Sequence, residues 1–466
     1  MDIKTRKKTD TVPLSRSVNP RKISFWDFLV ILAMGCLLLY GISPQLFRLG
    51  DDAAKYECYA VAFWHGTQAT KKLPTEQCAF LTQINPPLIK QAAFVNDLKH
   101  LHMPDSVISF FASQSSSASF HALPHEYPAL ALIPFSASLL VPAHNSQIAF
   151  ALVMILLAIG MYFVMLKSRS RAAAIMFAAY LVVGGWVTAA GRFDLIPASL
   201  TFLAFLASVK QRWLLAYILL AIATLIKLYP VYLLPAFLVA QQSSPRVNWR
   251  HWYDGRRWAA LSVYIGVCVL ILLVSLGLNV EGTLAPFGYF KDRPVQVESF
   301  SASILWLSSL ITHQHLSYEF TFGSLNIVNT SGVQFSLPGT LCLIGGLLYT
   351  LWLQWKRKID LATALLLTLL IVIVTTKVFS PQYLIWVIPF AAYIGEARLR
   401  WLIPWIALGL LTTWIYPYIY EMVPLSQVGY LPIFYPVTTI RNFLFLGCAI
   451  ALLIIATRRP ALALAK

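Results

Sequence analysis

Six short polar clusters interrupt a strongly apolar chain, and each holds side chains capable of acid–base or anion-binding chemistry. Adjacent carboxylates at Asp51 and Asp52 can accept a proton from a hydroxyl group. Cations such as Lys227 and Arg293 can stabilise a departing anion through charge and hydrogen bonds. The clusters occupy residues 50–56, 126–128, 191–194, 227–230, 291–299 and 377–383. This combination predicts a site in which a general base works beside a cationic anion-binding group.

The segments between these clusters have the composition of membrane-spanning helices. The 466-residue chain is 58% hydrophobic and 12% charged, which exceeds what a soluble fold can bury. Lipid tolerates only helices or closed barrels, and the apolar runs lack the period-two alternation of barrel strands. We therefore predict an all-α polytopic membrane protein with about twelve transmembrane helices. The expected spans are 24–46, 146–166, 172–190, 195–209, 213–228, 229–242, 259–278, 337–355, 361–376, 382–396, 401–417 and 435–457.

Basic residues predict how these spans are oriented. Residues 1–23 carry seven Lys and Arg residues, and further basic clusters fall at alternate span ends, as the positive-inside rule requires. Both chain ends are then cytoplasmic: a disordered basic tail at 1–23, a membrane domain at 24–457 and a second tail at 458–466. The net charge of +17 is explained by this topology, so nucleic acid is not an expected partner.

Three long segments are predicted on the outer face: 47–145, 279–336 and 418–434. Two apolar pieces, 128–143 and 300–312, do not fit as full crossings because counting either would place a basic cluster outside. We expect them to be re-entrant or interfacial helices on the outer face. All six polar clusters fall on this same face of the membrane.

Cysteine and histidine usage limits the expected redox and metal chemistry. Cys58 and Cys78 share the first outer segment, where the compartment allows a disulfide. The sequence does not supply the distance that the bond needs, so the bonded and free forms both remain open. The nine His residues form no ligand set with Cys or clustered carboxylates, so no metal and no cofactor is expected.

Four of the polar stretches, which lie between roughly residues 50 and 390, match the sequence motifs of one protein family in the same order. They are, in chain order, Asp52-x-x-x-Tyr56 followed by Gly66, Lys227-Leu228-Tyr229-Pro230, Arg293 with Gln296, Glu298 and Ser299, and Phe379-Ser380-Pro381-Gln382-Tyr383-Leu384-Ile385-Trp386-Val387-Ile388-Pro389. Together they resemble glycosyltransferase family 87 of the glycosyltransferase C superfamily, which includes mycobacterial polyprenol-phosphate-mannose-dependent mannosyltransferases. Two features depart from the family pattern. Ala129 stands where a second Pro usually follows Tyr127-Pro128, and the first outer loop is long with a doubled Asp.

The resemblance implies an inverting membrane hexosyltransferase of the glycosyltransferase C fold. It would move a sugar, mannose by analogy, from a polyprenyl-phosphate donor to an envelope glycolipid or glycan at the outer face of the plasma membrane. Asp52 is the expected general base, with Asp51 as the alternative. The expected donor-phosphate ligands are Arg293, Lys227 and Lys377. The expected sugar or acceptor ligands are Gln296, Glu298, Gln382, Tyr383, Glu126, Tyr127, Arg192 and Asp194.

At most one of the two adjacent aspartates, Asp51 and Asp52, is expected to act as the general base. Adjacent side chains point in different directions on a helix or a strand, so only one of Asp51 and Asp52 is expected to face the donor. The spacing to Tyr56 favours Asp52, because both would share one face of a helix. The alternative role for Asp52 is a solvated helix N-cap.

Other charged residues also have structural alternatives. Lys227 can extend along a span end toward the membrane surface, and Gln382 can simply cap a helix. Arg192 and Asp194 lie two residues apart at a helix start, and we predict that they pair with each other. Arg293 can pair with a neighbouring acid.

Two other functions compete with the transferase. A transporter or flippase of lipid-linked sugars would also need cations at the membrane edge, but it should carry charges along a midplane path and often an internal repeat. Neither stands out in the sequence. A non-catalytic scaffold subunit would account for the long outer loops but not for the polar clusters.

Overall fold

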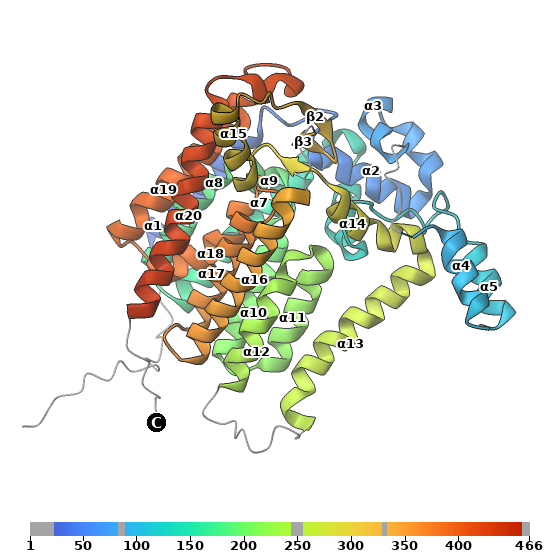
Figure 1. Cartoon of the computed structure of the whole chain (residues 1–466), viewed down its shortest axis with the longest axis horizontal. Coiled ribbons are helices and arrows are strands. Elements are labelled where there is room, and N and C mark those ends of the chain that lie inside the picture. The colour runs from blue at the N-terminus through green and yellow to red at the C-terminus, as the bar shows by residue number, and fades with distance from the viewer. Residues whose placement is uncertain (1–22, 83–88, 244–254, 329–332, 459–466) are drawn as a thin grey trace, which may run out of the picture.

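The computed structural model describes residues 23–82, 89–243, 255–328 and 333–458. Almost all of the predicted N-terminal tail, and all but one residue of the predicted C-terminal tail, lie outside the described residues. Within the described residues the chain is mostly helical (Figure 1).

Six of the described helical segments are long and apolar enough to cross a membrane, which makes the chain a polytopic membrane protein. They are α1 (Phe25–Ile42), α7 (Ser146–Ser168), α13 (Gly255–Leu278), α16 (Val333–Trp355), α19 (Leu399–Thr413) with the turn that follows it to Ile419, and α20 (Phe434–Arg458). Shorter apolar helices pack among them. They are α8 (Arg171–Gly185), α10 (Leu195–Val209), α11 (Trp213–Ile226), α15 (Phe300–Thr312), α17 (Leu361–Thr375) and α18 (Tyr383–Gly395).

The predicted span 229–242 differs from the structure in its local conformation. Residues 229–242 were expected to form one helix, but Tyr229–Leu233 is a short 3-10 segment and α12 (Leu234–Gln242) covers only nine residues. Pro230 and Pro235 explain the change, because each lacks the backbone N–H that a continuous α-helix needs.

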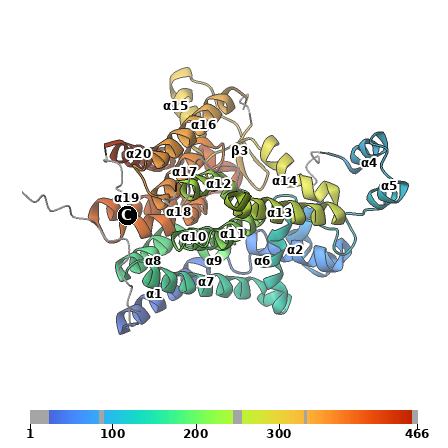
Figure 2. The ribbon, with the colours of Figure 1, turned by 90° about the horizontal axis from the view of Figure 1, so that it is seen from below.

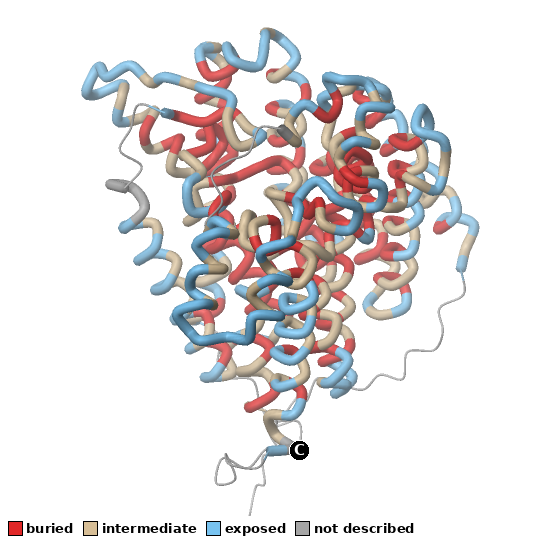
Figure 3. The backbone as a smooth tube through the Cα atoms, turned by 90° about the vertical axis from the view of Figure 1, so that its right-hand side faces the viewer, coloured by how far each residue is buried: buried red, intermediate tan, exposed pale blue. Residues whose placement is uncertain are grey.

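The apolar helices form a bundle whose centre is α17 (Figures 1 and 2). Residues 362–374 of α17 are all buried, as expected of a helix that is apolar all round. It packs against α16, α18 and α20, while α8 packs against α7, α18 and α19. The buried residues lie in the interior of the helix bundle and continue into the upper part of the molecule as drawn in Figure 3. Helix α13 is mostly exposed and lies at the edge of the bundle.

A glycine pair allows α8 and α19 to approach closely. A Cβ atom on Gly184 would lie 3.3 Å from the Cα atom of Gly409, and one on Gly409 would lie 3.1 Å from the backbone nitrogen of Gly184. Small residues at helix crossings give membrane bundles their close backbone packing. The pair therefore allows α8 and α19 to pack closely within the bundle.

A three-stranded antiparallel sheet lies at one end of the bundle, so the prediction of an all-α protein is wrong in this segment. The strands are β1 (Val295–Gln296), β2 (Tyr318–Thr321) and β3 (Ser324–Ile327), in the order β1-β3-β2. The β2–β3 hairpin turns at Phe322 and Gly323, both of which have positive φ, as a two-residue hairpin loop requires. Strands of two to four residues are too short to give a periodic signal in the sequence.

A separate hydrophobic cluster fixes this sheet to the bundle. Val297 and Ile327 pack with Ile415, Ile419 and Phe434. The last three belong to the turn after α19 and the start of α20. The sheet is therefore held by the ends of two membrane helices rather than by a flexible loop.

The described part of the first predicted outer segment begins with four α-helices: α2 (Asp52–His65), α3 (Thr75–Cys78), α4 (Gln91–His100) and α5 (Asp105–Ala112). Cys58 of α2 and Cys78 of α3 form a disulfide, with 2.00 Å between the two sulfur atoms. The remaining short helices are α6 (Leu132–Ser136), α9 (Thr188–Gly191) and α14 (Val280–Asp292). Helix α14 follows α13 and leads into the sheet.

Candidate active site

A cavity of about 200 Å³ lies where the start of α2, the sheet and the start of α18 meet. It brings together residues from five of the six polar clusters that the sequence singled out. The predicted site residues in its wall are Asp51, Asp52, Glu126, Tyr127, Arg192, Arg293, Gln296, Glu298, Gln382 and Tyr383. Lys227, Lys377 and Asp194 were also predicted, but they are not among the lining residues.

Asp52 is the first residue of α2 and is held by two cations. Its Oδ2 atom lies 2.7 Å from Nε of Arg192, and its Oδ1 atom lies 3.9 Å from Nζ of Lys55. Burial alone would raise the pKa of the Asp52 carboxyl, but the charges of Arg192 and Lys55 outweigh it and hold the pKa below its usual value. Asp52 is therefore an ionised carboxylate at neutral pH.

Asp51 also lines the cavity, next to Asp52. Asp51 is the N-cap of α2 and has extended backbone angles, whereas Asp52 is already helical. The geometric rule for neighbours within one regular element does not apply across this boundary. Burial, with the adjacent Asp52 charge, raises the pKa of Asp51 to about 7. The two acids therefore differ in charge near neutral pH.

Arg192 pairs with Asp52 and not with Asp194, which corrects the predicted pairing. The residue ends the short helix α9 with extended backbone angles, and its guanidinium also lies 5.6 Å from the ring centroid of Tyr416. Helix packing across 140 positions of sequence determines this contact. The separation of only two residues between Arg192 and Asp194 had favoured Asp194 as the partner.

Arg293 projects from the segment between α14 and β1. Its Nη2 atom donates a hydrogen bond to Oγ of Ser324 at 2.7 Å, and its guanidinium lies 5.6 Å from the ring centroid of Tyr289. Two buried polar atoms of cavity residues, Nε of Arg293 and Oε1 of Gln382, have no hydrogen-bond partner among the described residues. Buried polar atoms normally have partners, so both are available to a ligand.

Glu126 lies opposite the hairpin turn. A Cβ atom on Gly323 would lie 3.5 Å from both Oε1 of Glu126 and the hydroxyl oxygen of Tyr289. Burial raises the pKa of the Glu126 carboxyl above its ordinary value, although Lys55 partly opposes that shift. A methyl group at position 323 would therefore make an ordinary contact with this carboxylate.

Lys227 and Asp194 form a buried pair away from the cavity wall. Nζ of Lys227 lies 2.6 Å from Oδ1 of Asp194, and the indole nitrogen of Trp386 donates to the same oxygen at 2.7 Å. The Lys227 ammonium also lies 5.0 Å from the ring centroid of Phe193. Trp386 stacks between Tyr229 and Tyr383, with ring centroids 3.9 Å apart on each side. These contacts stabilise Lys227 within the protein.

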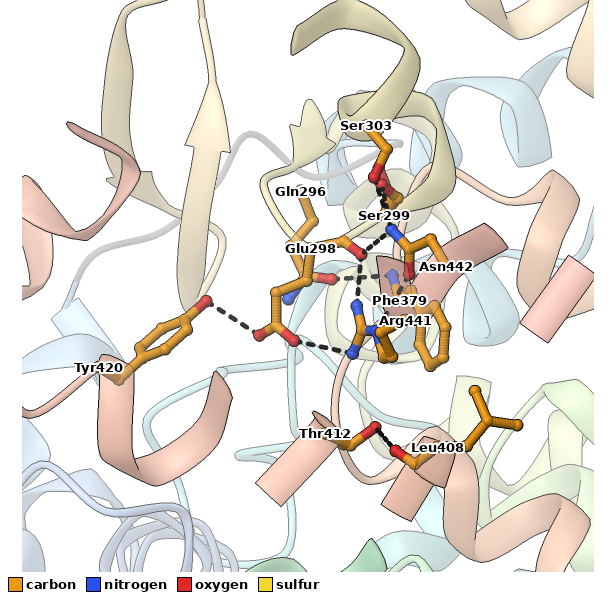
Figure 4. A network of polar contacts seen from close by, with 10 residues as sticks. All are labelled: Gln296, Glu298, Ser299, Ser303, Phe379, Leu408, Thr412, Tyr420, Arg441 and Asn442. Carbon is orange, nitrogen blue, oxygen red and sulfur yellow. Dashed lines mark hydrogen bonds and ion pairs between the residues drawn. The ribbon is translucent and has the colours of Figure 1, made fainter. Parts of the chain in front are cut away.

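Glu298 belongs to a buried polar network (Figure 4). The Tyr420 hydroxyl donates to Oε1 of Glu298 at 2.9 Å, and Nη1 of Arg441 lies 3.2 Å from Oε2. Nη2 of Arg441 donates to the Glu298 carbonyl at 2.7 Å, and Asn442 donates to the same carbonyl at 3.0 Å. Arg441 also lies 4.0 Å from the ring centroid of Phe379. The network fixes the segment before α15 to α20.

A family model for glycosyltransferase family 87 matches residues 126–381, which is more than half of the chain. The chain belongs to glycosyltransferase family 87. It is therefore a membrane glycosyltransferase, an enzyme of the transferase type. Searches of curated proteins and of solved structures returned no match.

The family match covers only part of the cavity wall of this glycosyltransferase. It includes Glu126, Arg192 and Arg293, but it begins after Asp52 and ends before Gln382. The structure brings these outlying residues to the same cavity as the matched ones.

Two predicted ligands of the glycosyltransferase, Gln296 and Lys377, also make hydrogen bonds that position the backbone. Oε1 of Gln296 accepts a hydrogen bond from the backbone N–H of Phe379 at 2.9 Å, and the Gln296 N–H donates to the Lys377 carbonyl. Nζ of Lys377 donates to the Lys291 carbonyl at 2.8 Å. These bonds join β1 and the end of α14 to the segment that carries Ser380 and Pro381 into the cavity.

Sequence reasoning did not single out four residues that build the glycosyltransferase site: Tyr289, Tyr416, Tyr420 and Arg441. The tyrosines gave no distinguishing signal among the 21 in the chain. Arg441 did give such a signal, because it is the one charged residue in the apolar run 435–457. Burying a charge in such a segment costs free energy unless the charge has a specific partner. Across the described residues, no group of three or more His, Cys, Asp and Glu side chains is arranged to hold a metal ion.

Proposed function

We propose that the protein transfers a hexose, with mannose as the candidate sugar, from a polyprenyl-phosphate donor to an envelope glycolipid or glycan. The observation that carries the proposal is the shared cavity of Asp52 and Arg293. One supplies an ionised carboxylate, and the other supplies a cation with an unpartnered Nε atom among the described residues. These are the two groups that transfer from a lipid phosphate requires.

The proposed reaction is a single displacement. The acceptor hydroxyl attacks the anomeric carbon, its proton passes to Asp52, and the bond from that carbon to the phosphate oxygen breaks. The leaving phosphate takes the bonding electrons and remains an anion beside Arg293. Attack opposite the leaving group inverts the configuration at the anomeric carbon. Arg192 positions Asp52 through their 2.7 Å contact.

Gln382, Tyr127 and Tyr383 are proposed sugar contacts. All three line the cavity, and Oε1 of Gln382 can accept a hydrogen bond from a sugar hydroxyl. Glu126 is proposed as an acceptor contact, because it lines the cavity and its carboxyl oxygens can accept hydrogen bonds from hydroxyl groups. Lys227 and Lys377 are not part of the proposed phosphate site, because Lys227 pairs with Asp194 and Lys377 donates to the Lys291 carbonyl.

The site is proposed to face outward across a plasma membrane, with both termini cytoplasmic. Single cysteines at Ser115 and Ser243 test this arrangement, in a background where the four free cysteines are replaced. An impermeant thiol reagent added to whole cells is expected to label position 115 and spare position 243. The reverse pattern would contradict the proposed orientation.

The transferase itself is tested by incubating purified full-length protein with radiolabelled polyprenyl-phosphate mannose and a membrane lipid extract. A labelled glycolipid or glycan product is expected, together with release of the lipid phosphate. Loss of donor without a labelled product would indicate hydrolysis. An unchanged donor in the presence of every acceptor fraction would refute mannose transfer by this protein.

A further inference from the structure

Helices α4 and α5 form a hairpin that projects beyond the outline of the bundle (Figure 2). Every residue of the two helices is described, yet none is buried, and none joins either hydrophobic cluster of the described core. The helices have ten and eight residues. Isolated helices shorter than about 12–15 residues are only marginally stable in water. The hairpin therefore needs a further surface to stabilise it.

The hairpin has an apolar side that its own packing does not cover. The side chains at positions 107, 108, 110 and 111 of α5 are all apolar, at a spacing that places them on one side of the helix. Phe111 packs on Phe94 of α4, with ring centroids 5.2 Å apart. Phe110 remains 52% exposed, and Leu101 in the turn between the helices is 70% exposed. The apolar surface thus extends beyond the contact that joins the two helices.

Hydrogen bonds join the hairpin to one end of the membrane helix α13. Gln114, which follows α5, donates from Nε2 to the Leu276 carbonyl at 2.8 Å and accepts from the Val280 N–H at 2.9 Å. At the start of α4, the Gln91 N–H donates to Oε1 of Glu281 at 2.8 Å. Both ends of the hairpin are therefore fixed where α13 ends and α14 begins.

Helix α13 marks the level of the membrane surface. Its apolar stretch Arg257–Leu278 has 22 residues. At 1.5 Å per residue it extends about 33 Å, which matches a hydrocarbon core of about 30 Å and places Leu278 near one surface. Figure 1 shows the hairpin at the height of the upper part of α13, with α5 below α4. The exposed apolar side chains of the hairpin thus lie at the depth of the lipid leaflet that surrounds α13.

Charge gives the hairpin no preference for a charged partner. The segment 90–112 carries two lysines, Lys90 and Lys99, and two aspartates, Asp97 and Asp105, and all four are exposed. Their formal charges cancel, so a nucleic acid or a strongly charged protein surface would gain little attraction from them. The apolar side chains remain as the basis of binding, and they favour the hydrocarbon of a bilayer.

We propose that the α4–α5 hairpin is an interfacial membrane anchor, which inserts Leu101 and Phe110 into the lipid leaflet beside the Leu278 end of α13. Amphipathic helices of this kind lie along the interface with their apolar side about 5–10 Å deep. Through Gln91 and Gln114, the anchor holds the junction of α13 and α14 at the membrane surface. The hairpin lies outside the residues that match the family model, and the inference does not depend on the proposed reaction.

Spin labels on single cysteines test the anchor in the full chain, reconstituted in phosphatidylcholine vesicles. The four free cysteines are replaced, and the disulfide is kept. Leu101→Cys and Phe110→Cys place labels on the apolar surface. Asn96→Cys is the matched control, because Asn96 is exposed and lies two positions beyond Phe94, so that it points away from α5.

Collisions of each label with oxygen, which concentrates in lipid, and with a water-soluble nickel chelate report its depth. The ratio of oxygen to nickel accessibility at positions 101 and 110 is expected to be at least about tenfold higher than at position 96. Equal ratios at all three positions would place the hairpin in water and overturn the proposal. Shielding of labels 101 and 110 from both reagents would also overturn it, since a protein partner or a second copy would then cover them.

Hydrogen exchange provides a second test without labels. In vesicles of the same lipid, the double variant Leu101→Ser/Phe110→Ser should exchange the amide hydrogens of residues 91–112 at least about tenfold faster than the wild type. The reason is that the short helices lose the lipid contact that stabilises them. Asn96→Ser, the control, should exchange at the wild-type rate. Equal exchange in the double variant and the wild type would overturn the anchor.

Discussion

Two pairs of carboxylate and arginine in this protein look alike in sequence but differ in their surroundings. Asp52 lies 2.7 Å from Arg192, and both side chains keep some exposure to the cavity, at 19% and 18%. Glu298 lies 3.2 Å from Arg441, and their side chains are 2% and 0% exposed. Asp52 and Glu298 both line the cavity, but the pair of Glu298 and Arg441 is almost completely enclosed.

The difference lies in how completely each carboxylate is satisfied. Glu298 uses one oxygen for Tyr420 and the other for Arg441. Asp52 has one close partner, while its second oxygen is 3.9 Å from Lys55. A buried carboxylate with both oxygens engaged holds structure together, whereas a partly open one can accept a proton. Exposure and hydrogen-bond saturation therefore separate a reactive pair from a structural pair.

The largest expected effect follows from breaking the structural pair. Arg441→Leu leaves the Glu298 carboxylate buried without its cation, which should destabilise the fold by about 3–5 kcal/mol. The fraction of protein that survives heating in detergent measures the loss. Arg48→Leu is the matched control, because Arg48 and Glu421 form an exposed pair at 3.1 Å. Such a pair contributes about 0–1 kcal/mol. Equal stability of the two variants would contradict the structural role.

The next effect concerns donor binding. Arg293→Lys replaces a planar fork with a single point charge, and the two bind phosphate differently. Use of the polyprenyl-phosphate donor should weaken by at least about tenfold, or roughly 1.4 kcal/mol. Steady-state kinetics at several donor concentrations measure the loss of donor use. Arg48→Lys, on the exposed surface, is the control. Unchanged kinetics in Arg293→Lys would remove this residue from the proposed phosphate site.

The smallest expected effect comes from Asp51. Its pKa of about 7 means that it is mostly neutral at pH 6 and mostly ionised at pH 8. The proposed donor is a phosphodiester whose single negative charge does not change over this range. Ionised Asp51 repels that charge, so KM for the donor should rise about threefold between pH 6 and pH 8. Asp51→Asn should abolish the rise and change turnover only mildly. A persistent rise in the variant would exclude Asp51 as its source.

Much of the bundle was predictable because lipid imposes a simple compositional rule on each span. The expected spans 146–166, 213–228 and 361–376 closely match α7, α11 and α17. The sheet was not predictable, because its strands are too short for periodicity and depend on the cluster around Ile415 and Phe434. The number of crossings also does not follow from the six long helices alone.

The composition of the cavity was more predictable than the contacts within it. Ten of the expected site residues line it, because polar clusters at the ends of apolar segments converge on one side of a bundle. The pairing of Arg192 with Asp52 depends on how the tertiary fold brings the start of α2 to the end of α9, which local spacing does not encode. Lys227 shows the same limit, since its partner Asp194 lies 33 positions earlier in the chain.

The central claim is that Asp52 takes the acceptor proton, and the most direct test is Asp52→Asn. The change keeps the shape of the side chain and removes its basicity, so turnover should fall by about 10²-fold or more while donor binding survives. Turnover and donor affinity are measured on the same preparations of wild type, Asp52→Asn and Asp97→Asn, the last being an exposed control on α4. Near-normal turnover in folded Asp52→Asn that still binds donor would contradict the account.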